Sequence, residues 1–150
     1  IQDLINEVVH NLSVKWLKKN IQFQYKKGNE SPVYVFADRN KIYQLLVNVF
    51  SNAAKYGKID GYITASIYAM EDGKILIEIS DNGIGIAEEH IPRLFERFYR
   101  TDDARSREVG GTGLGLAICK HIIEAHNESI QVRSKINVGT TVGFTLASKA

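Results

Sequence analysis

A glycine-rich stretch that runs into a helical pattern constrains this chain more than any other feature. It reads Gly110-Gly111-Thr112-Gly113-Leu114-Gly115 and continues as an apolar helix. Because glycine has no β-carbon, the backbone here can adopt positive φ and approach a ligand closely. The helix that follows begins with unpaired N–H groups and a partial positive charge, which together favour phosphate. The stretch lacks the Gly-Lys-[Ser/Thr] of a P-loop, and a flexible hinge before an amphipathic helix remains the alternative.

Length and composition indicate one domain, residues 1–150, with its own core. The chain has 150 residues, of which 44% are hydrophobic, and this is enough for a single compact unit. A formal charge of +2 without a basic run argues against nucleic acid as a partner. The single cysteine, Cys119, fits a reducing compartment, and its apolar neighbours predict that it lies in the core.

The start of the chain predicts a piece of a longer protein. Ile1 opens a helical pattern without a starting methionine. No stretch approaches the ~20 apolar residues that span a bilayer, and the first residues do not form a signal peptide. We therefore expect a fragment, and membrane anchoring of its parent protein is compatible with this expectation.

Hydrophobic periodicity predicts helices and strands in the order αββαββαββ. Apolar residues at helical spacing predict helices over 2–19, 39–56 and 114–126, with a short helix near 87–92. Asp3 and Asp38 are the expected N-caps of the first two. Alternating or β-branched runs predict strands at 21–25, 33–37, 62–69, 74–80, 129–133 and 141–146. This order is typical of an α+β two-layer sandwich, a mixed but mostly antiparallel sheet with helices on one face.

Three polar residues share one face of the predicted helix 39–56. Asn48, Asn52 and Lys55 are spaced i, i+4 and i+7. Asparagine is a poor helix former, so two of them one turn apart indicate a function. An amide oxygen suits Mg²⁺ beside phosphate oxygens, and Lys55 adds a positive charge to the same face. The alternative is a solvated face on which two asparagines coincide.

An acidic residue follows the predicted strand 74–80. Asp81-Asn82-Gly83-Ile84-Gly85 comes directly after a β-branched run, which puts a carboxylate at a strand end with glycine backbone beside it. Such an acceptor suits the exocyclic amine of adenine. Taken alone, the same residues are also explained by an ordinary Asp-Asn-Gly turn.

Aromatic and charged residues precede the glycine-rich stretch. Residues 94–100 read Leu-Phe-Glu-Arg-Phe-Tyr-Arg, and 101–109 are charged without periodicity. The stretch 101–109 is predicted to be a mobile lid hinged at Gly110 and Gly111. With the residues before it, this lid (95–110) is expected to cover a cleft between the helix 39–56 and the glycine-rich stretch. Arg97 or Arg100 can bring charge to a terminal phosphate, and the aromatic residues can equally form a docking patch for a partner.

Together these segments resemble the catalytic and ATP-binding domain of bacterial sensor histidine kinases, in the Bergerat-fold ATPase superfamily. Residues 48–56 resemble the asparagine box, 81–85 the first glycine box, 94–100 the phenylalanine box, 111–116 the second glycine box and 139–141 the last. The blocks occur in the family's order and cover nearly the whole chain. The resemblance is closest to the kinases of the phosphate-sensor and cell-wall-sensor type.

The resemblance implies a role for each matching residue. Asn52 would coordinate Mg²⁺ with support from Asn48, and Lys55 would hold phosphates. Arg100 would meet the γ-phosphate, and Tyr56 would pack on or near adenine. Asp81 would accept from the adenine amine, with Thr141 assisting through water. The remaining nucleotide-binding positions would be Gly83, Gly85, Ile86, Gly111, Thr112, Gly113, Leu114, Gly115 and Leu116.

The resemblance also implies an activity and partners. The chain would bind Mg²⁺–ATP and transfer the γ-phosphoryl group to a histidine on a separate dimerisation domain of the same parent kinase, upstream of a response regulator. The isolated domain would be a cytoplasmic monomer, and the parent a homodimer anchored in the bacterial inner membrane. Asn48 stands where the ATP-hydrolysing relatives carry a glutamate, and a neutral amide cannot activate water as a base.

Two features depart from the family pattern. No histidine here has the context of a phosphate-accepting residue, so the fragment is expected to bind ATP without phosphorylating itself. Asn127 and Asn137 stand where glycines are usual. Because asparagine tolerates positive φ, both turns are expected to survive.

Two other classes fit the same motifs. One is a regulatory module of the same fold, such as an anti-sigma-factor kinase that phosphorylates serine on a partner protein. The other is a free-standing ATPase, against which Asn48 argues. The phenylalanine box favours the histidine kinase, because it resembles the part that docks the histidine-bearing helix.

Overall fold

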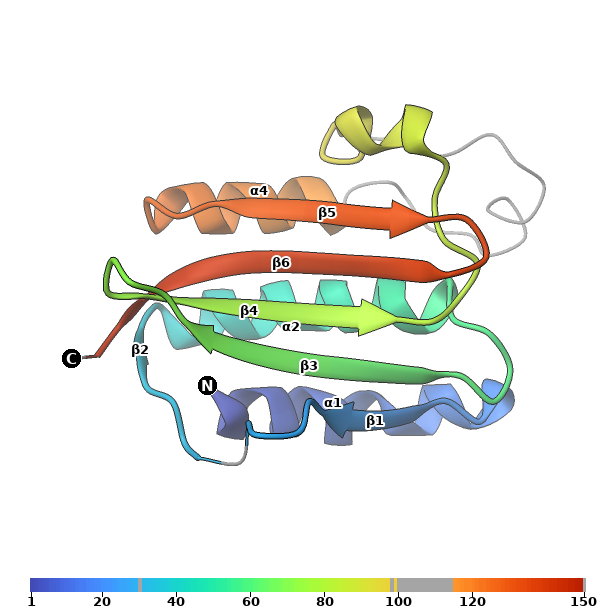
Figure 1. Ribbon diagram of the computed structural model, residues 1–150, viewed down its shortest axis with the longest axis horizontal. Helices are drawn as coiled ribbons and strands as arrows, with labels where there is room; N and C mark the ends of the chain where they lie inside the picture. The colour runs from blue at the N-terminus through green and yellow to red at the C-terminus, as the bar shows by residue number, and fades with distance from the viewer. Residues whose placement is uncertain (30, 98, 100–114, 150) are drawn as a thin grey trace.

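The chain folds into two layers, a six-stranded sheet with helices behind one of its faces (Figure 1). The computed structural model describes residues 1–29, 31–97, 99 and 115–149. Its helices are α1 (Gln2–Trp16), α2 (Arg39–Lys55) and α4 (Gly115–Ala125), with the 3₁₀-helices η1 (Leu17–Lys19) and η2 (Glu88–Arg93). Its strands are β1 (Gln22–Tyr25), β2 (Val35–Phe36), β3 (Tyr62–Ala69), β4 (Lys74–Asp81), β5 (Ile130–Lys135) and β6 (Gly139–Ser148).

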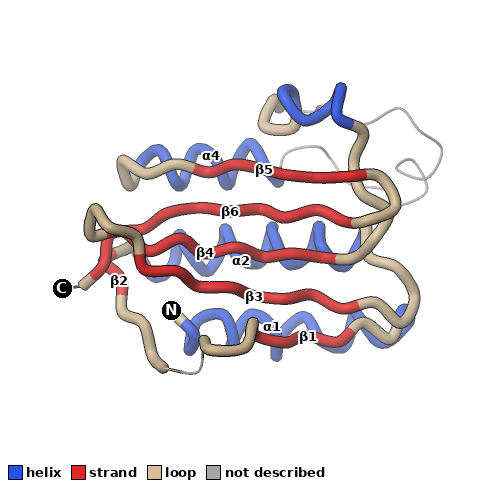
Figure 2. The backbone as a smooth tube through the Cα atoms, in the orientation of Figure 1, coloured by secondary structure: helices blue, strands red, loops and turns tan. Residues whose placement is uncertain are grey.

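The strands follow the spatial order β1-β3-β4-β6, and two strands share the far edge of β6. β5 pairs with residues 139–144 of β6, and β2 pairs with residues 147 and 148. β1 runs parallel to β3, whereas the other pairings among the described strands are antiparallel. Figure 2 shows the helices together on one side of these strands. The predicted fold class is thereby confirmed.

The core lies between the sheet and the helices. β4 turns Ile75, Ile77 and Ile79 inward, and β6 turns Val142 and Phe144 inward beside them. Burying an aliphatic or aromatic side chain of this size stabilises the fold by about 1.5–3 kcal/mol. Because successive strand residues point to opposite faces, this register also fixes the direction of the polar residues at the ends of both strands.

Two side chains fix the start of α2. Asp38 is its N-cap, as predicted, and its carboxylate accepts from the Lys41 N–H at 3.1 Å. From the end of α4, His126 Nε2 accepts from the Asp38 N–H at 3.0 Å, and Nδ1 lies 2.8 Å from the Ile122 carbonyl. Since a backbone N–H can only donate, Nδ1 carries the ring hydrogen. The end of α4 therefore holds the start of α2.

Some predicted boundaries are wrong. Asp3 does not cap α1, because the helix already begins at Gln2 with Ile1 as its N-cap. The strand predicted at 33–37 shortens to β2, and the helix predicted near 87–92 is the 3₁₀-helix η2.

The two unusual asparagines behave as predicted. Asn127 has φ 57° and Asn137 has φ 64°, so both turns keep a left-handed residue without glycine. The predicted lid, 101–109, lies outside the described residues. Among the helices that the structure describes, none combines the length and the apolar character needed to cross a membrane.

Candidate nucleotide site

The polar face of α2 lies beneath the first turn of α4. Asn48 and Asn52 are half-buried, and Lys55 is exposed. A β-carbon added to Gly115 would lie 3.8 Å from Asn52 Nδ2 and 4.0 Å from Asn48 Cγ. The structure therefore brings the first residue of α4 over both asparagines, although more than 60 positions separate them in the sequence. Leu116, the next predicted site residue, is half-buried.

Cys119 contacts the same face one turn further along α4. Its side chain is fully buried, its Sγ donates to the Leu45 carbonyl at 3.7 Å, and the Asn48 side chain hydrogen-bonds to the sulfur. Burial raises the pKa of the thiol to about 12, so it is protonated at neutral pH. Cys119 is thus the core residue that the sequence predicted, with a contact to Asn48 that the sequence did not indicate.

Asp81 ends β4 with its carboxylate turned toward the helical layer. The register continues the inward series of Ile77 and Ile79, and the side chain is half-buried. Desolvation raises the pKa of Asp81, and hydrogen bonds from the backbone N–H groups of Gly83 and Thr140 partly offset this. The Gly83 bond measures 2.9 Å. A half-buried carboxylate at a strand end that remains destabilised despite two donors is typical of a binding site.

The loop after Asp81 packs closely against the end of α2 on one side and the end of β5 on the other. On one side the Ile84 N–H donates to the Tyr56 carbonyl at 3.0 Å, and a β-carbon on Gly83 would lie 2.0 Å from that same oxygen. On the other side a β-carbon on Gly85, which has φ 73°, would lie 2.1 Å from the Lys135 carbonyl. The Ile86 N–H donates to Ser134 Oγ at 2.7 Å. The first-glycine-box residues are therefore held between the end of α2 and the β5–β6 hairpin.

The register of β6 corrects the position of Thr141. Thr141 faces away from the helical layer, and its Oγ1 lies 2.7 Å from Ser80 Oγ on the open face of the sheet. Thr140 is the register partner of Asp81, is 9% exposed and points inward. The predicted site residue Thr141 therefore lies on the opposite face of the sheet from Asp81. The inward positions 142, 144 and 146 repeat every second residue and could have identified Thr140 from the sequence.

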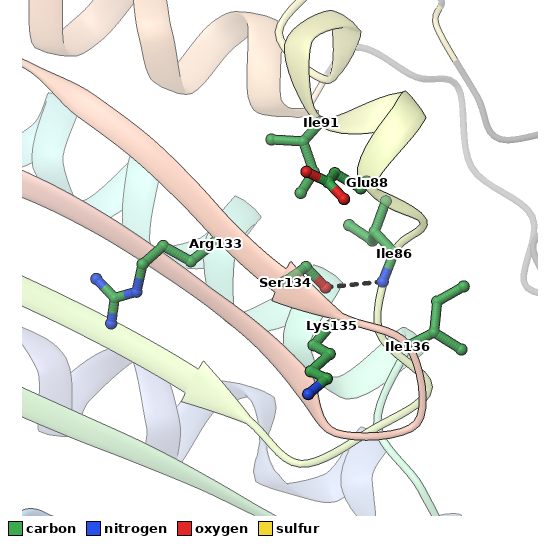
Figure 3. A pocket seen from close by; sticks show the side chains of 7 residues that line it. All are labelled: Ile86, Glu88, Ile91, Arg133, Ser134, Lys135 and Ile136. Carbon is green, nitrogen blue, oxygen red and sulfur yellow. Dashed lines mark hydrogen bonds between the residues drawn. The ribbon is translucent and has the colours of Figure 1, made fainter.

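A cavity of about 410 Å³ opens beside the same loop, between η2 and β5 (Figure 3). It is lined by Ile86, Glu88, Ile91, Arg133, Ser134, Lys135 and Ile136. In Figure 3 the side chains of Arg133 and Lys135 extend away from Ile86 and Ile91, and Arg133 pairs with Glu78. Of the predicted site residues that the structure describes, Ile86 alone lines this cavity, which is therefore distinct from the face of Asn48 and Asn52.

Other predicted site residues fall outside the described part of the chain. These are Arg100, Gly111, Thr112, Gly113 and Leu114. Within the described residues there is no group of three or more His, Cys, Asp or Glu side chains suited to a metal ion. Any divalent cation at the face of Asn48 and Asn52 would therefore need oxygens from its ligand as well as from the amides.

Residues 37–150 match the family model of the histidine kinase-, DNA gyrase B- and HSP90-like ATPases. The chain belongs to this family. The resemblance drawn from the five boxes is thereby confirmed. The elements α1, η1, β1 and β2 precede residue 37 and therefore lie outside the matched region.

Curated relatives of this ATPase domain are bacterial sensor kinases. The chain is 47% identical to the sensor histidine kinase WalK of Bacillus subtilis over 118 residues, which cover 78% of this chain and 19% of the relative. It is 36% identical to the sensor protein RprX of Bacteroides fragilis over 139 residues, 92% of this chain and 27% of that one. The chain thus spans between 19% and 27% of the length of these relatives.

Solved structures of histidine kinases share the fold. The catalytic domain of the histidine kinase ThkA has a TM-score of 0.80 at 32% identity, over 97% of this chain and 92% of that one. Full-length ShkA in complex with AMPPNP has a TM-score of 0.85 at 26% identity, over all of this chain and 31% of that one. The fold is that of histidine kinase catalytic domains, the Bergerat fold.

Proposed function

We propose that this domain binds Mg²⁺–ATP and transfers the γ-phosphoryl group to a histidine on a separate dimerisation domain of its parent sensor kinase. The observation that carries the proposal is the contact between α2 and α4, which places Gly115 close to Asn48 and Asn52. The carboxylate of Asp81 lies at the start of the first glycine loop, where it accepts from the Gly83 N–H. The complex of the relative ShkA with AMPPNP supports an adenine nucleotide as the ligand.

Asp81 and the loop after it are proposed to hold adenine. The carboxylate would accept from the exocyclic amine, and Tyr56 would pack on or near the base. Gly83, Gly85 and Ile86 would supply backbone beside it. We assign the assisting hydroxyl to Thr140 in place of Thr141, because Thr140 lies on the same face as Asp81.

The face of α2 is proposed to hold the phosphates and the metal. Asn52 would supply an amide oxygen to Mg²⁺, with Asn48 in support, and the phosphates would supply further oxygens. When bound, Mg²⁺ neutralises charge on the phosphates. Lys55 and the backbone of 111–116 would bind phosphate, and Arg100 would meet the γ-phosphate. These residues position the nucleotide for in-line attack by the acceptor.

The proposed transfer breaks the bond between the γ-phosphorus and the β,γ-bridging oxygen and forms a bond to an imidazole nitrogen of the acceptor, with ADP as the leaving group. Asn48 is a neutral amide and does not take a proton from water at neutral pH. We infer that ATP is held for the external histidine and is hydrolysed slowly. The complex of ThkA with the response regulator TrrA supports a response regulator as the downstream partner of the parent. The parent is further proposed to be a homodimer anchored in the bacterial inner membrane.

A transfer assay tests this function. The domain is incubated with γ-labelled ATP and Mg²⁺, with and without a separately produced dimerisation hairpin of the parent. We expect acid-labile label on the hairpin and none on the domain alone. Acid-stable label on a partner protein would instead indicate a serine kinase of the same fold. Rapid release of phosphate by the domain alone would indicate a free-standing ATPase.

A further inference from the structure

The ammonium of Lys19 caps the C-terminal end of α2. Its Nζ donates to three carbonyls in the last turn and just beyond it, those of Ala54 at 3.2 Å, Lys55 at 2.7 Å and Gly57 at 3.1 Å. An ammonium has three hydrogens, so these bonds use its full donor capacity. A cation at this end of a helix also interacts favourably with the helix dipole. Lys19 thus joins three carbonyls of one short segment through a single ammonium, and the Ala54 carbonyl also accepts from the Gly57 N–H at 3.3 Å.

The turn after α2 is tied to the same short connector by further bonds. The Asp60 N–H donates to the Lys19 carbonyl at 2.7 Å, and the Gln22 N–H donates to the Gly61 carbonyl at 3.1 Å. Asn20, at φ 51°, donates from its amide to the Asp60 carboxylate at 2.8 Å. Residues 19–22 therefore hold the whole turn from 57 to 61.

The segment that Lys19 caps is also the segment that holds the first glycine loop. Tyr56 lies between the Lys55 and Gly57 carbonyls that Lys19 binds, and its own carbonyl accepts from the Ile84 N–H at 3.0 Å. A chain of short contacts therefore runs from Lys19 through Tyr56 to Ile84, three residues from Asp81. Lys19 precedes residues 37–150, the region that the family model matches.

We propose that Lys19 is a positioning residue that holds the loop 81–86 in place against α2 and thereby sets the affinity for the adenine end of a nucleotide. The second half of this inference rests on the proposed function. Small displacements of a binding loop lower affinity strongly, because every contact of the preorganised site depends on the same geometry.

The test compares three variants at a temperature where circular dichroism finds each one fully folded. Lys19→Met removes the ammonium and keeps the stem, whereas Lys19→Arg keeps a cationic donor. Lys18→Met is the matched control, because Lys18 is exposed and adjacent. Amide hydrogen exchange of Ile84 is measured without nucleotide, and the affinity for AMPPNP is measured by calorimetry with and without Mg²⁺.

We expect Lys19→Met to speed Ile84 exchange about tenfold and to weaken AMPPNP binding roughly fivefold to twentyfold, with the ratio of affinities with and without Mg²⁺ unchanged. Lys19→Arg should recover most of both effects, and Lys18→Met should show neither. Native exchange at Ile84 in Lys19→Met would overturn the inference. If the native domain itself does not bind AMPPNP, the proposed function is wrong, and the exchange experiment alone then decides whether Lys19 holds the loop.

Discussion

The carbonyl oxygen of Tyr56 lies so close to Gly83 that a β-carbon at position 83 would be 2.0 Å from it. That oxygen also accepts from the Ile84 N–H, so it cannot move aside without breaking the bond. The end of α2 and the loop after β4 are therefore one unit. A side chain at position 83 would separate the two parts that we assign to adenine.

Gly83→Ala is expected to destabilise the domain by about 1–3 kcal/mol, because the overlap must be relieved by moving backbone. AMPPNP binding should weaken in parallel. Urea unfolding and calorimetry measure the two effects. Gly143→Ala is the matched control, since a β-carbon there would meet its nearest atom, Glu78 Cγ, at an ordinary 3.5 Å. Equal stability of the two variants would contradict the close contact.

Asp81→Asn should separate stability from binding. Burial raises the pKa of Asp81, so the folded state holds the proton of this carboxyl more tightly than the unfolded chain does, and ionisation of the carboxyl opposes folding. Replacement by a neutral amide should therefore change the free energy of unfolding by less than about 1 kcal/mol. The amide oxygen can still accept from Gly83, which turns the amide hydrogens toward the proposed adenine amine.

Adenine-nucleotide affinity of Asp81→Asn should accordingly fall at least about tenfold, because two donors would face each other. Isothermal calorimetry with ADP and thermal unfolding measure the pair of effects. Asp72→Asn, in the exposed turn before β4, is the control and should leave both unchanged. Undiminished affinity in Asp81→Asn would refute the adenine assignment.

Asn52→Ala should abolish the effect of Mg²⁺ on nucleotide binding, because it removes the proposed amide ligand while the α2 backbone remains. Asn127→Gly should bind as the native domain does, since Asn127 already has φ 57° and glycine adopts this conformation readily. Titration of AMPPNP with and without Mg²⁺ distinguishes them. A native Mg²⁺ dependence in Asn52→Ala would show that the metal is held elsewhere.

Local patterns predicted much of this fold from the sequence. The apolar periodicity predicted the bounds of α2 to within one residue. Asp38 could be predicted as the N-cap because a capping side chain bonds to a backbone N–H only a few residues further along the chain. That Asn48 and Asn52 share one face of α2 was predictable for the same reason, since helical spacing determines which residues lie on the same face. Asp3 failed as a cap because α1 begins at Gln2, two residues earlier than an N-cap at Asp3 would require, and the exact start of a helix is the least predictable part of it.

Long-range relationships were not predictable in this way. Lys19 caps a helix end more than 30 residues away, and His126 bonds to Asp38 across 88 positions. Neither residue carries a local signal, because a lysine or histidine near a helix end is common in any sequence. Thr140 was missed for another reason. The alternation of Val142, Phe144 and Leu146 already puts Thr140 on their face, but that Asp81 shares this face follows only from the register of β6 against β4.

Cys119 should give the folded domain a pH dependence at the alkaline end. Burial raises the pKa of its thiol to about 12, above the ordinary value of 9.0. Above about pH 9 the unfolded chain loses this proton and the folded chain keeps it, so the unfolded state binds fewer protons and stability falls as pH rises. The stabilising contribution is complete below pH 9 and is lost progressively toward pH 12.

Cys119→Ser isolates this contribution, because serine keeps a donor for the Leu45 carbonyl and does not titrate in this range. Urea unfolding is measured from about pH 7 to 10.5 for both proteins, so that other groups such as Tyr25, whose pKa is also raised to about 12, cancel in the difference. The difference in unfolding free energy should be constant up to about pH 8.5 and should then shift in favour of the serine variant. A difference that stays flat across the whole range would mean that the thiol ionises as easily in the folded domain as in the unfolded chain, and would contradict its burial against Asn48.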